Sequence, residues 1–298
     1  MIESNRKGII LAGGKGTRLN PITKAVSKQL MPIYDKPMIY YPLSTLMLIG
    51  IKNILIITTP DDQESFKSLL GDGNSWGINI KYEIQKKPEG LAQAFIIGKN
   101  FIDKSPVALI LGDNIFYGEE MIHKIRKSNL DYDKSTIFGY AVKDPSRYGV
   151  VEFNEKKEIL SLEEKPYKPK SRFVITGLYF YENNVIEKVR NLQPSIRGEL
   201  EITDLNKEYL KERKLNLELF SRGTAWLDTG TFDSLYEACG FIQTLEKRQG
   251  FKVGCPEEVA WRNGWISDKE LKIQSLNYKN SGYGDYLSDL LKLKNKFN

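Results

Sequence analysis

The sequence contains very little cysteine or histidine. Among 298 residues the two cysteines, Cys239 and Cys255, form no C-x-x-C pair and cannot build a disulfide framework. This usage predicts a reducing compartment, with the cytoplasm as the default location. His123 is the one histidine, and no serine lies in a G-x-S-x-G turn, so Ser-His-Asp hydrolysis is disfavoured.

Long apolar runs and blocks of one charge are also missing. No run of about 18 apolar residues occurs, and no charged start is followed by an apolar stretch, so the sequence predicts neither a membrane span nor export. The 44 Lys and Arg residues are scattered among 38 Asp and Glu residues, which favours anionic small molecules as partners. A nucleic-acid-binding protein would also fit the net charge of +6, but no basic stripe interleaved with aromatic residues is visible.

Apolar runs bounded by Gly, Pro, Asn and Asp alternate with segments of helical period, a pattern typical of a sheet with helices on both faces. In the first half, parallel strands are expected at 9–12, 54–57, 80–83 and 107–111. Helices are expected between them at 38–49, 62–70 and 90–101. Mixed or antiparallel strands are expected at 135–140, 149–153, 159–164 and 173–180, where few helices intervene.

The last third of the sequence favours helices. We expect helices at 185–192 and 201–211, a strand at 215–220, and a helix that opens at Thr231 and is ended by Gly250. Pro256 then indicates another helix start. The prediction is an α/β fold with a Rossmann-like mixed sheet flanked by helices, followed by a C-terminal helical appendage.

A glycine-rich segment follows the first expected strand. Gly13, Gly14 and Gly16 would let backbone N–H groups form an anion-binding nest, and Lys15 and Arg18 add positive charge. The segment is not a Walker A loop, because no Gly-Lys-Ser or Gly-Lys-Thr closes the spacing, and it does not complete G-x-G-x-x-G. Three glycines alone would equally fit a tight strand-to-helix turn, but the adjacent arginine favours a phosphate site.

The glycine segment belongs to a longer spaced motif. Lys28, which alone would read as a solvated charge, completes G-G-x-G-T-R-L-x-P-x-T-x-x-x-x-K-x-x-x-P with Pro32. This motif resembles the signature of the sugar-nucleotide pyrophosphorylases, and its continuation at Asp35–Pro42 resembles the glucose-1-phosphate thymidylyltransferases in particular. The Met and Tyr residues of that continuation are expected to pack in the core. The resemblance extends over nearly the whole chain, through Leu111–Asn114, Arg147–Val151, Ser161–Pro166, Arg197–Asp204, Trp226–Gly230 and Cys255–Glu258.

The resemblance implies a magnesium site at two aspartates. Asp113 follows an apolar strand and Asp228 ends a short apolar run, so both are expected at the sheet edge where open α/β folds bind ligands. Mg²⁺ takes one or two carboxylates together with substrate phosphates. Either aspartate alone could instead cap a helix.

The resemblance also assigns the sugar-phosphate site. Lys165 is expected to hold the sugar phosphate, although its charge run would otherwise suggest a solvated strand end. Glu164 and Glu199 are expected to accept hydrogen bonds from sugar hydroxyls, because an ionised carboxylate offers only acceptors. Glu199 would also suit a helix N-terminus. Tyr148 and the backbone of Gly149 are expected beside the hexose.

Nucleotide binding is implied by the resemblance for a further group of residues. The amides of Gln29 and Gln85 can donate and accept at once, as a pyrimidine edge requires, and Gly90 is expected against the base. The phosphates are assigned to the glycine segment, at Gly13, Gly14, Gly16, Thr17 and Arg18. Lys15 stands where relatives often carry a small polar residue, which leaves the exact charge of the phosphate site open.

The resemblance implies, as the expected activity, transfer of a thymidylyl group from dTTP to α-D-glucose 1-phosphate, giving dTDP-glucose and pyrophosphate, the first step toward dTDP-L-rhamnose. The expected catalytic residues are Arg18, Lys28, Asp113, Lys165 and Asp228. A UTP-preferring enzyme and a noncatalytic nucleotide-sugar-binding protein remain alternatives.

The catalytic domain is expected at residues 1–250, with the nucleotide in its first half. Residues 251–298 are expected to support a homotetramer and feedback by dTDP-rhamnose.

Overall fold

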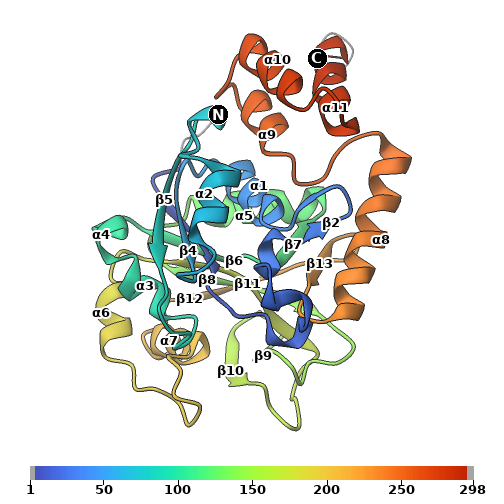
Figure 1. Cartoon of the computed structure of the whole chain (residues 1–298). Helices are drawn as coiled ribbons and strands as arrows, with labels where there is room; N and C mark the ends of the chain where they lie inside the picture. The colour runs from blue at the N-terminus through green and yellow to red at the C-terminus, as the bar shows by residue number, and fades with distance from the viewer. Residues whose placement is uncertain (1–3, 294–298) are drawn as a thin grey trace.

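The computed structural model describes residues 4–293 of the chain. At its centre lies a nine-stranded sheet in which seven strands follow the order β10-β9-β11-β6-β1-β4-β5, while β8 joins β11 to β12 (Figure 1). The strands of this sheet are β1 (Lys7–Ala12), β4 (Asn53–Thr58), β5 (Asn79–Ile84), β6 (Val107–Leu111), β8 (Ser135–Ala141), β9 (Gly149–Phe153), β10 (Ile159–Glu164), β11 (Phe173–Tyr181) and β12 (Leu215–Leu219).

The sheet has a parallel part and an antiparallel part. β1 pairs in parallel with β4 and β6, and β4 pairs in parallel with β5. β11 runs antiparallel to β6, β8 and β9, and β12 returns in parallel beside β8. The predictions of a parallel first half and a mixed second half are therefore confirmed.

Strand alternation divides the core between the two faces of the sheet. On β1, Ile10 and Ala12 join one buried cluster, while Ile9 and Leu11 join the other. The first cluster is covered by α1 (Tyr40–Leu48), α2 (Gln63–Leu70) and α5 (Glu119–Asn129). The second is covered by α3 (Gln93–Ile97), α4 (Lys99–Ile102), α6 (Val185–Arg190) and α7 (Ile202–Lys211). The prediction of helices on both faces is confirmed.

One expected helix is interrupted. The predicted helix at 90–101 begins only at Gln93 and divides into α3 and α4 at Gly98. Gly90 has a φ of 102°, which a right-handed helix does not allow. At Gly98 an added Cβ would lie 3.0 Å from the Leu55 side chain, so glycine lets the chain approach β4 at the cost of helix propensity.

Two small antiparallel pairs and one long helix complete the substrate side of the molecule. β7 (Asn114–Tyr117) pairs with β13 (Ala225–Asp228), and β2 (Pro32–Ile33) pairs with β3 (Lys36–Pro37). The long helix α8 (Phe232–Gln249) starts with a capping box in which Thr231 accepts from the Ser234 backbone N–H. Gly250, which follows the last helical residue, has a φ of 73°, so the predicted end of this helix is confirmed.

The C-terminal region is helical, as predicted. It consists of α9 (Pro256–Arg262), α10 (Asp268–Asn277) and α11 (Gly282–Leu293) and lies at the top of Figure 1, with α9 packed on α1. Pro256 stands in the first turn of α9. The division at residue 250 stays a prediction, and its last residues, 294–298, lie outside the described part of the chain.

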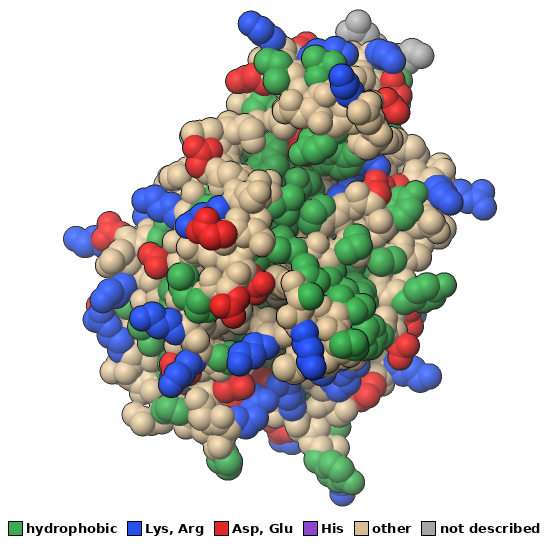
Figure 2. Space-filling view, in the orientation of Figure 1, with side chains coloured by type: hydrophobic (Ala, Val, Ile, Leu, Met, Phe, Trp, Pro, Cys, Tyr) green, Lys and Arg blue, Asp and Glu red, His purple; other side chains and the backbone are tan. Residues whose placement is uncertain are grey.

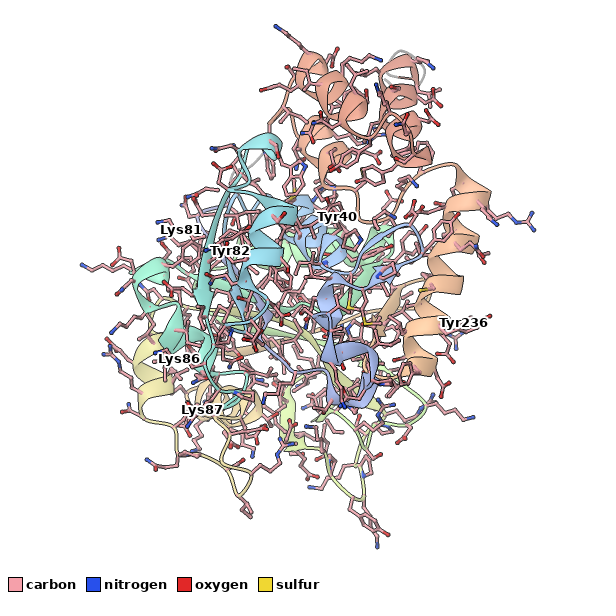
Figure 3. All side chains as sticks on the ribbon, in the orientation of Figure 1. Tyr40, Lys81, Tyr82, Lys86, Lys87 and Tyr236 are labelled. Carbon is pink, nitrogen blue, oxygen red and sulfur yellow. The ribbon has the colours of Figure 1, made fainter. Side chains whose placement is uncertain are left out.

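The surface carries mixed charge. Figure 2 shows basic and acidic side chains interspersed over the viewed face. At the sheet edge, Lys81 on β5 is exposed, and Lys86 and Lys87 follow this strand (Figure 3). Such lysines oppose pairing with another sheet. No helix within residues 4–293 has the length and apolarity needed to cross a bilayer.

Candidate active site

A cleft of about 580 Å³ opens where β1 and β6 end and where the antiparallel β11 passes them. This is the edge at which α/β sheets bind ligands. The predicted site residues that line it are Gly14, Thr17, Arg18, Gln29, Gln85, Gly90, Asp113, Tyr148, Gly149, Glu164, Lys165, Glu199 and Asp228. Residues from seven separate motifs therefore meet in one cavity.

The predicted residues Gly13 and Gly16 lie just behind the lining. A Cβ at Gly13 would lie 2.2 Å from Gln85 Oε1, and Gly16 has a φ of 59° with Thr23 and Lys28 close by. Both positions thus require glycine, one for space and one for backbone conformation. Gly14 has open space above it, and the exposed Arg18 follows in the 3₁₀ turn Thr17–Leu19.

Lys28 does not itself line the cleft but forms a close ion pair with Asp113, which does. Lys28 begins the 3₁₀ turn Lys28–Leu30, and its Nζ lies 2.5 Å from Asp113 Oδ2. Asn114 Nδ2 donates to the other carboxylate oxygen at 2.7 Å. The Lys28 side chain is 7% exposed, so the solvated interpretation of that lysine alone is wrong. The carboxylate of Asp113 is held in one orientation by these two donors.

Asp228 lies beside Asp113 because β13 pairs with β7, where Asp228 is opposite Asn114. Neither aspartate caps a helix, since one lies between β6 and β7 and the other ends β13. Tyr148 donates its hydroxyl to Asp228 Oδ1 at 2.8 Å, and Arg147 lies 4.0 Å from Oδ2. Burial raises the pKa of Asp228, the nearby charge of Asp113 adds to the rise, and the Tyr148 hydrogen bond opposes it.

The two aspartates fit a cation that is shared with a ligand. Two adjacent carboxylates repel each other when both are ionised, and a divalent ion between them would relieve that repulsion. Mg²⁺ commonly uses one or two carboxylates and takes its remaining ligands from water and phosphate. Within residues 4–293 no group of three or more His, Cys, Asp and Glu side chains forms a metal cage of its own.

The far end of the cleft combines carboxylates with cations. Lys165 has a φ of 44°, unusual for a non-glycine residue, and its backbone N–H donates to the Tyr148 carbonyl at 3.0 Å. Its Nζ lies 3.4 Å from Glu164, which also accepts from Thr203 at 2.5 Å. Glu199 lines the cleft rather than starting a helix, because α7 begins at Ile202.

Arg197 is a cation of the cleft to which the sequence analysis gave no role. Its guanidinium donates to both oxygens of Glu201, at 2.8 and 2.9 Å, and lies within 3.7 Å of Glu164 and Glu199. Burial works to lower its pKa, but the hydrogen bonds to Glu201 raise the pKa on balance. Arg197 therefore presents a permanent positive charge to the cleft.

Other lining residues were missed as well. Arg147 and Trp226 lie in motifs quoted above, and Asn114 follows Asp113 directly. The Asn114 side chain accepts from Trp226 Nε1 at 2.6 Å and from the Gly177 N–H at 3.1 Å, which ties β7, β13 and β11 together. Their position inside or next to the motifs could have indicated a role in the site. The direction of each side chain, however, depends on this tertiary pairing of the strands.

The predicted base-binding residues also line the cleft. Gln29 is buried and accepts from the Ser27 hydroxyl at 2.9 Å. Gln85 is buried and donates to Gln93 at 2.7 Å. Both amides are thus oriented by a neighbouring side chain. Gly90 approaches the Leu200 backbone so closely that an added Cβ would lie 2.3 Å from its carbonyl oxygen.

A second cavity, of about 800 Å³, lies between α1, β7, α5 and the segment that connects α8 to α9. Aromatic and cationic side chains line much of it, including Tyr41, Phe116, Phe251, Arg126, Lys252 and Arg262. We refer to this space as the second cavity.

A family model described as nucleotidyl transferase matches residues 7–244. The chain belongs to the nucleotidyl transferase family. The prediction of family and fold is therefore confirmed, and the enzyme class with it. Nucleotidyltransferases of this kind generally use a divalent metal, for which the aspartate pair is the candidate site.

Curated relatives share almost the full length of this nucleotidyltransferase. A glucose-1-phosphate thymidylyltransferase from Neisseria meningitidis is 56% identical over 286 residues, covering 96% of this chain and 99% of the relative. One from Mycobacterium tuberculosis (strain H37Rv) is 57% identical over 285 residues, with the same coverage. Identity at this level includes the helical region beyond residue 250.

Solved structures show the same fold. A crystallised Bacillus anthracis chain, named for glucose-1-phosphate thymidylyltransferase activity and bound to sucrose, has a TM-score of 0.73 and 39% identity, covering 79% of this chain and 94% of its own. A UDP-glucose pyrophosphorylase complexed with UDP-glucose has a TM-score of 0.71 and 25% identity, covering 80% and 99%.

Proposed function

We propose that this chain transfers the thymidylyl group of dTTP to α-D-glucose 1-phosphate and releases pyrophosphate, forming dTDP-glucose. The names of the curated relatives support this activity. The observation that carries the proposal is that the Asp113–Asp228 pair faces the same cleft as Arg18 and Lys165. Two anions and a cation have complementary groups in this one cavity.

The reaction requires positioning more than covalent chemistry from the protein. An oxygen of the sugar phosphate attacks the α-phosphorus of dTTP, the bond from that phosphorus to the bridging oxygen breaks, and pyrophosphate leaves opposite the attack. Arg18 and Lys28 offset the charge of the triphosphate, and Lys165 with Arg197 brings the second phosphate in against electrostatic repulsion. No covalent enzyme intermediate is needed.

Magnesium is the proposed metal, and Asp113 and Asp228 would hold it. When bound, it supplies positive charge to the phosphates during transfer. The chain contributes two oriented carboxylates for this purpose. Asp113 is fixed by Lys28 and Asn114, and Asp228 is fixed by Tyr148.

Recognition of sugar and base is assigned to opposite ends of the cleft. Glu164 and Glu199 are placed to accept from hexose hydroxyls, and the bare backbone of Gly149, beside Tyr148, leaves space for the ring. Gln29 and Gln85 would read the pyrimidine edge, with Gly90 beside the base. Gly13, Gly14, Gly16 and Thr17 shape the loop for the phosphates.

A pyrophosphate-release assay with four nucleotides and several sugar phosphates tests the proposal. The expected result is fastest turnover with dTTP and glucose 1-phosphate. A preference for UTP would support the alternative suggested by the shared pyrimidine edge and by the UDP-glucose pyrophosphorylase likeness. Nucleotide-sugar binding without turnover in any combination would support a noncatalytic binding protein.

The second cavity is the proposed regulatory site for dTDP-rhamnose, the product toward which dTDP-glucose would lead. Its aromatic walls suit a base, and Arg126, Lys252 and Arg262 suit a diphosphate. Arg262→Ala should weaken inhibition by dTDP-rhamnose and leave uninhibited turnover unchanged. Inhibition of equal strength in that variant would argue against the assignment. The homotetramer and the cytoplasmic location stay predictions.

A further inference from the structure

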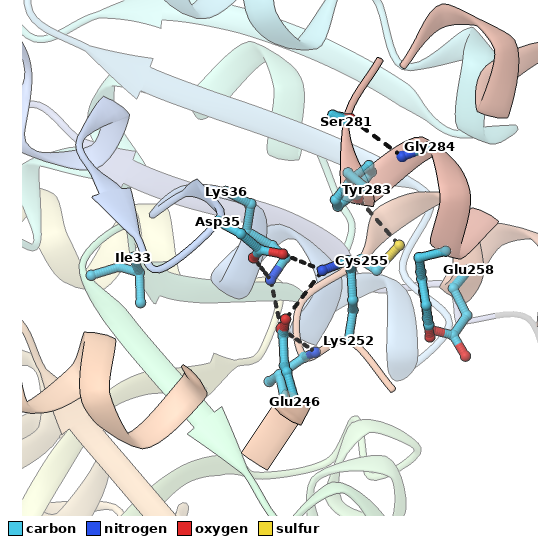
Figure 4. A network of polar contacts seen from close by, with 12 residues as sticks. Ile33, Asp35, Lys36, Glu246, Lys252, Cys255, Glu258, Ser281, Tyr283 and Gly284 are labelled. Atoms are coloured by element: carbon cyan, nitrogen blue, oxygen red, sulfur yellow. Dashed lines mark hydrogen bonds and ion pairs between the residues drawn. The ribbon is translucent and has the colours of Figure 1, made fainter. Parts of the chain in front are cut away.

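Four charged side chains, Asp35, Lys36, Glu246 and Lys252, form a cluster beside the second cavity, which Lys252 lines (Figure 4). Lys36 on β3 places its Nζ 2.5 Å from Asp35 and 2.7 Å from Glu246 of α8. Lys252, beyond the end of α8, contacts Asp35 and lies 3.3 Å from the second oxygen of Glu246. The Lys36 and Glu246 side chains are only 1% and 5% exposed. Two cations and two carboxylates thus balance each other, with the Lys36–Glu246 pair shielded from water and the Asp35 and Lys252 side chains partly exposed, at 25% and 13%.

The Lys36 side of the cluster belongs to a hairpin that is hydrogen-bonded to the segment that carries Lys28 and Gln29. β2 and β3 form a hairpin with Asp35 and Lys36 at its tip. At the base of this hairpin the Ile39 N–H donates to the Gln29 carbonyl at 2.9 Å. Anchoring the tip therefore limits the movement of Gln29 at the base and of its neighbour Lys28, which is paired with Asp113.

The Glu246 side of the cluster belongs to the helix that follows Asp228. α8 spans 18 residues, about 27 Å at 1.5 Å per residue, and begins just after Thr229 and Gly230. The Thr229 N–H donates to the Asp113 carbonyl at 3.2 Å. One rigid helix therefore joins the aspartate pair to the carboxylate that holds the hairpin tip.

Burying these charged side chains costs free energy, and holding the hairpin in position gives a reason for that cost. A buried ion pair gains little net stability, because desolvation offsets the attraction, and removing one partner leaves an unpaired charge. Burial alone would raise the pKa of Asp35, but the ion pairs with Lys36 and Lys252 lower it on balance. The ion pairs of Lys36 and Lys252 with the two carboxylates therefore hold the hairpin tip in one place.

We propose that Lys36 and Glu246 are positioning residues for the nucleotide end of the cleft. By fixing the β2–β3 hairpin against α8, they set where Lys28 and Gln29 stand relative to Asp113 and Asp228. They do not line the cleft and touch no substrate. The proposal rests on the proposed function, because dTTP is taken as the substrate that Lys28 and Gln29 meet.

The test compares the kinetic parameters for the two substrates in Lys36→Met. kcat/KM for dTTP should fall on the order of 10- to 100-fold, as expected for a misplaced binding loop, while KM for glucose 1-phosphate stays within about twofold. Lys252→Met leaves Lys36 paired with both carboxylates and should have a smaller effect of the same kind. Lys188→Met is the matched control, because it removes an ion pair of 2.5 Å with Glu212 away from the cleft.

The double variant Lys36→Met/Glu246→Gln distinguishes a loss of positioning of the nucleotide-binding residues from a loss of folding stability. It keeps the remaining charges balanced, so it should regain much of the stability lost in Lys36→Met but not the affinity for dTTP. It also provides the test if Lys36→Met does not fold. The proposal is overturned if the double variant recovers both properties, or if dTTP and glucose 1-phosphate parameters change equally. Failure of the proposed function would appear separately, as absent turnover in the unmodified chain.

Discussion

The substrate cleft differs from the junction of α9 with α11, which contains Cys255, Glu257 and Tyr283, in how the carboxyl groups are surrounded. In the cleft, Asp113 is paired with the Lys28 ammonium and faces a space lined by further cations. At the junction, Glu257 is completely buried and accepts from the Tyr283 hydroxyl at 2.5 Å. The first arrangement pairs a carboxylate with a cation beside a space that a ligand can fill, and the second favours the neutral form of the carboxyl group.

The surroundings explain this difference. Burial raises the pKa of Glu257, and it also raises the pKa of Cys255, whose thiol lies 3.1 Å from the Tyr283 hydroxyl. Tyr40 enters the same region from α1 and packs edge-on against Trp76 at 5.9 Å (Figure 3). The polar groups of the junction therefore pack the C-terminal helices, whereas those of the cleft are oriented toward a space that ligands can fill.

The largest expected effect is that of Arg18→Ala. kcat/KM for dTTP should fall about 100-fold, or about 3 kcal/mol, because a charge that offsets the triphosphate is lost. The melting temperature should change little, since the side chain is exposed. Lys24→Ala, which removes an exposed cation outside the cleft, is the control. Full pyrophosphate release by Arg18→Ala would contradict the assignment.

Lys165→Ala should act on the other substrate. KM for glucose 1-phosphate should rise about tenfold or more, while KM for dTTP changes little, because the lysine lies at the sugar end of the cleft. Initial rates over a grid of both substrates measure the two constants. Lys168→Ala, three residues further along and outside the cleft, should behave like the unmodified chain. An equal change in both constants would show that the two ends are not separate.

Tyr148→Phe should change the pH dependence of the reaction. The hydroxyl donates to Asp228 and favours its ionised form, so its loss raises the pKa of that carboxyl further above the ordinary 3.8. Activity that needs ionised Asp228 is lost as pH falls through this pKa, and the acid limb of kcat/KM should therefore move to higher pH. Tyr140→Phe, whose ring also packs on Trp226, should leave the limb in place.

The smallest effect is expected at the junction, for Glu257→Gln. The folded-state pKa lies above the ordinary 4.5, so the unmodified chain loses stability as pH rises above 4.5 through the folded pKa. Glutamine does not ionise and avoids this loss. At pH 8 the variant should melt about 2–4 °C higher, corresponding to about 1 kcal/mol, and the advantage should shrink toward pH 4.5. Glu64→Gln, on an exposed helix face, should show no such trend.

Much of the fold follows from local sequence. Apolar runs such as β1 and β6, and stop signals such as Gly250, act over a few residues and so can be read directly. The pairing of β7 with β13 joins segments more than 100 residues apart, and no local pattern encodes it. The break at Gly98 depends on contact with Leu55, which is likewise a tertiary effect.

The candidate site was predictable only through its motifs. Spacing placed Asp113 and Asp228 at strand ends, but only the β7–β13 ladder sets them side by side. A lysine such as Lys28 ordinarily lies at the surface. Here it is buried, because its ion pair with Asp113 offsets the positive charge. The direction in which Arg197 points depends on its ion pair with Glu201, four residues later in the same connecting segment, so its role could not be read from charge alone.

The most direct test of the account is magnesium-dependent pyrophosphate release from dTTP and glucose 1-phosphate by Asp113→Asn and Asp228→Asn. Both substitutions keep the shape of the side chain and remove one of the two adjacent charges. Each variant is expected to fold normally and to lose at least about 100-fold in turnover at any magnesium concentration. Turnover close to that of the unmodified chain in both variants would contradict the claim that this aspartate pair is the centre of the reaction.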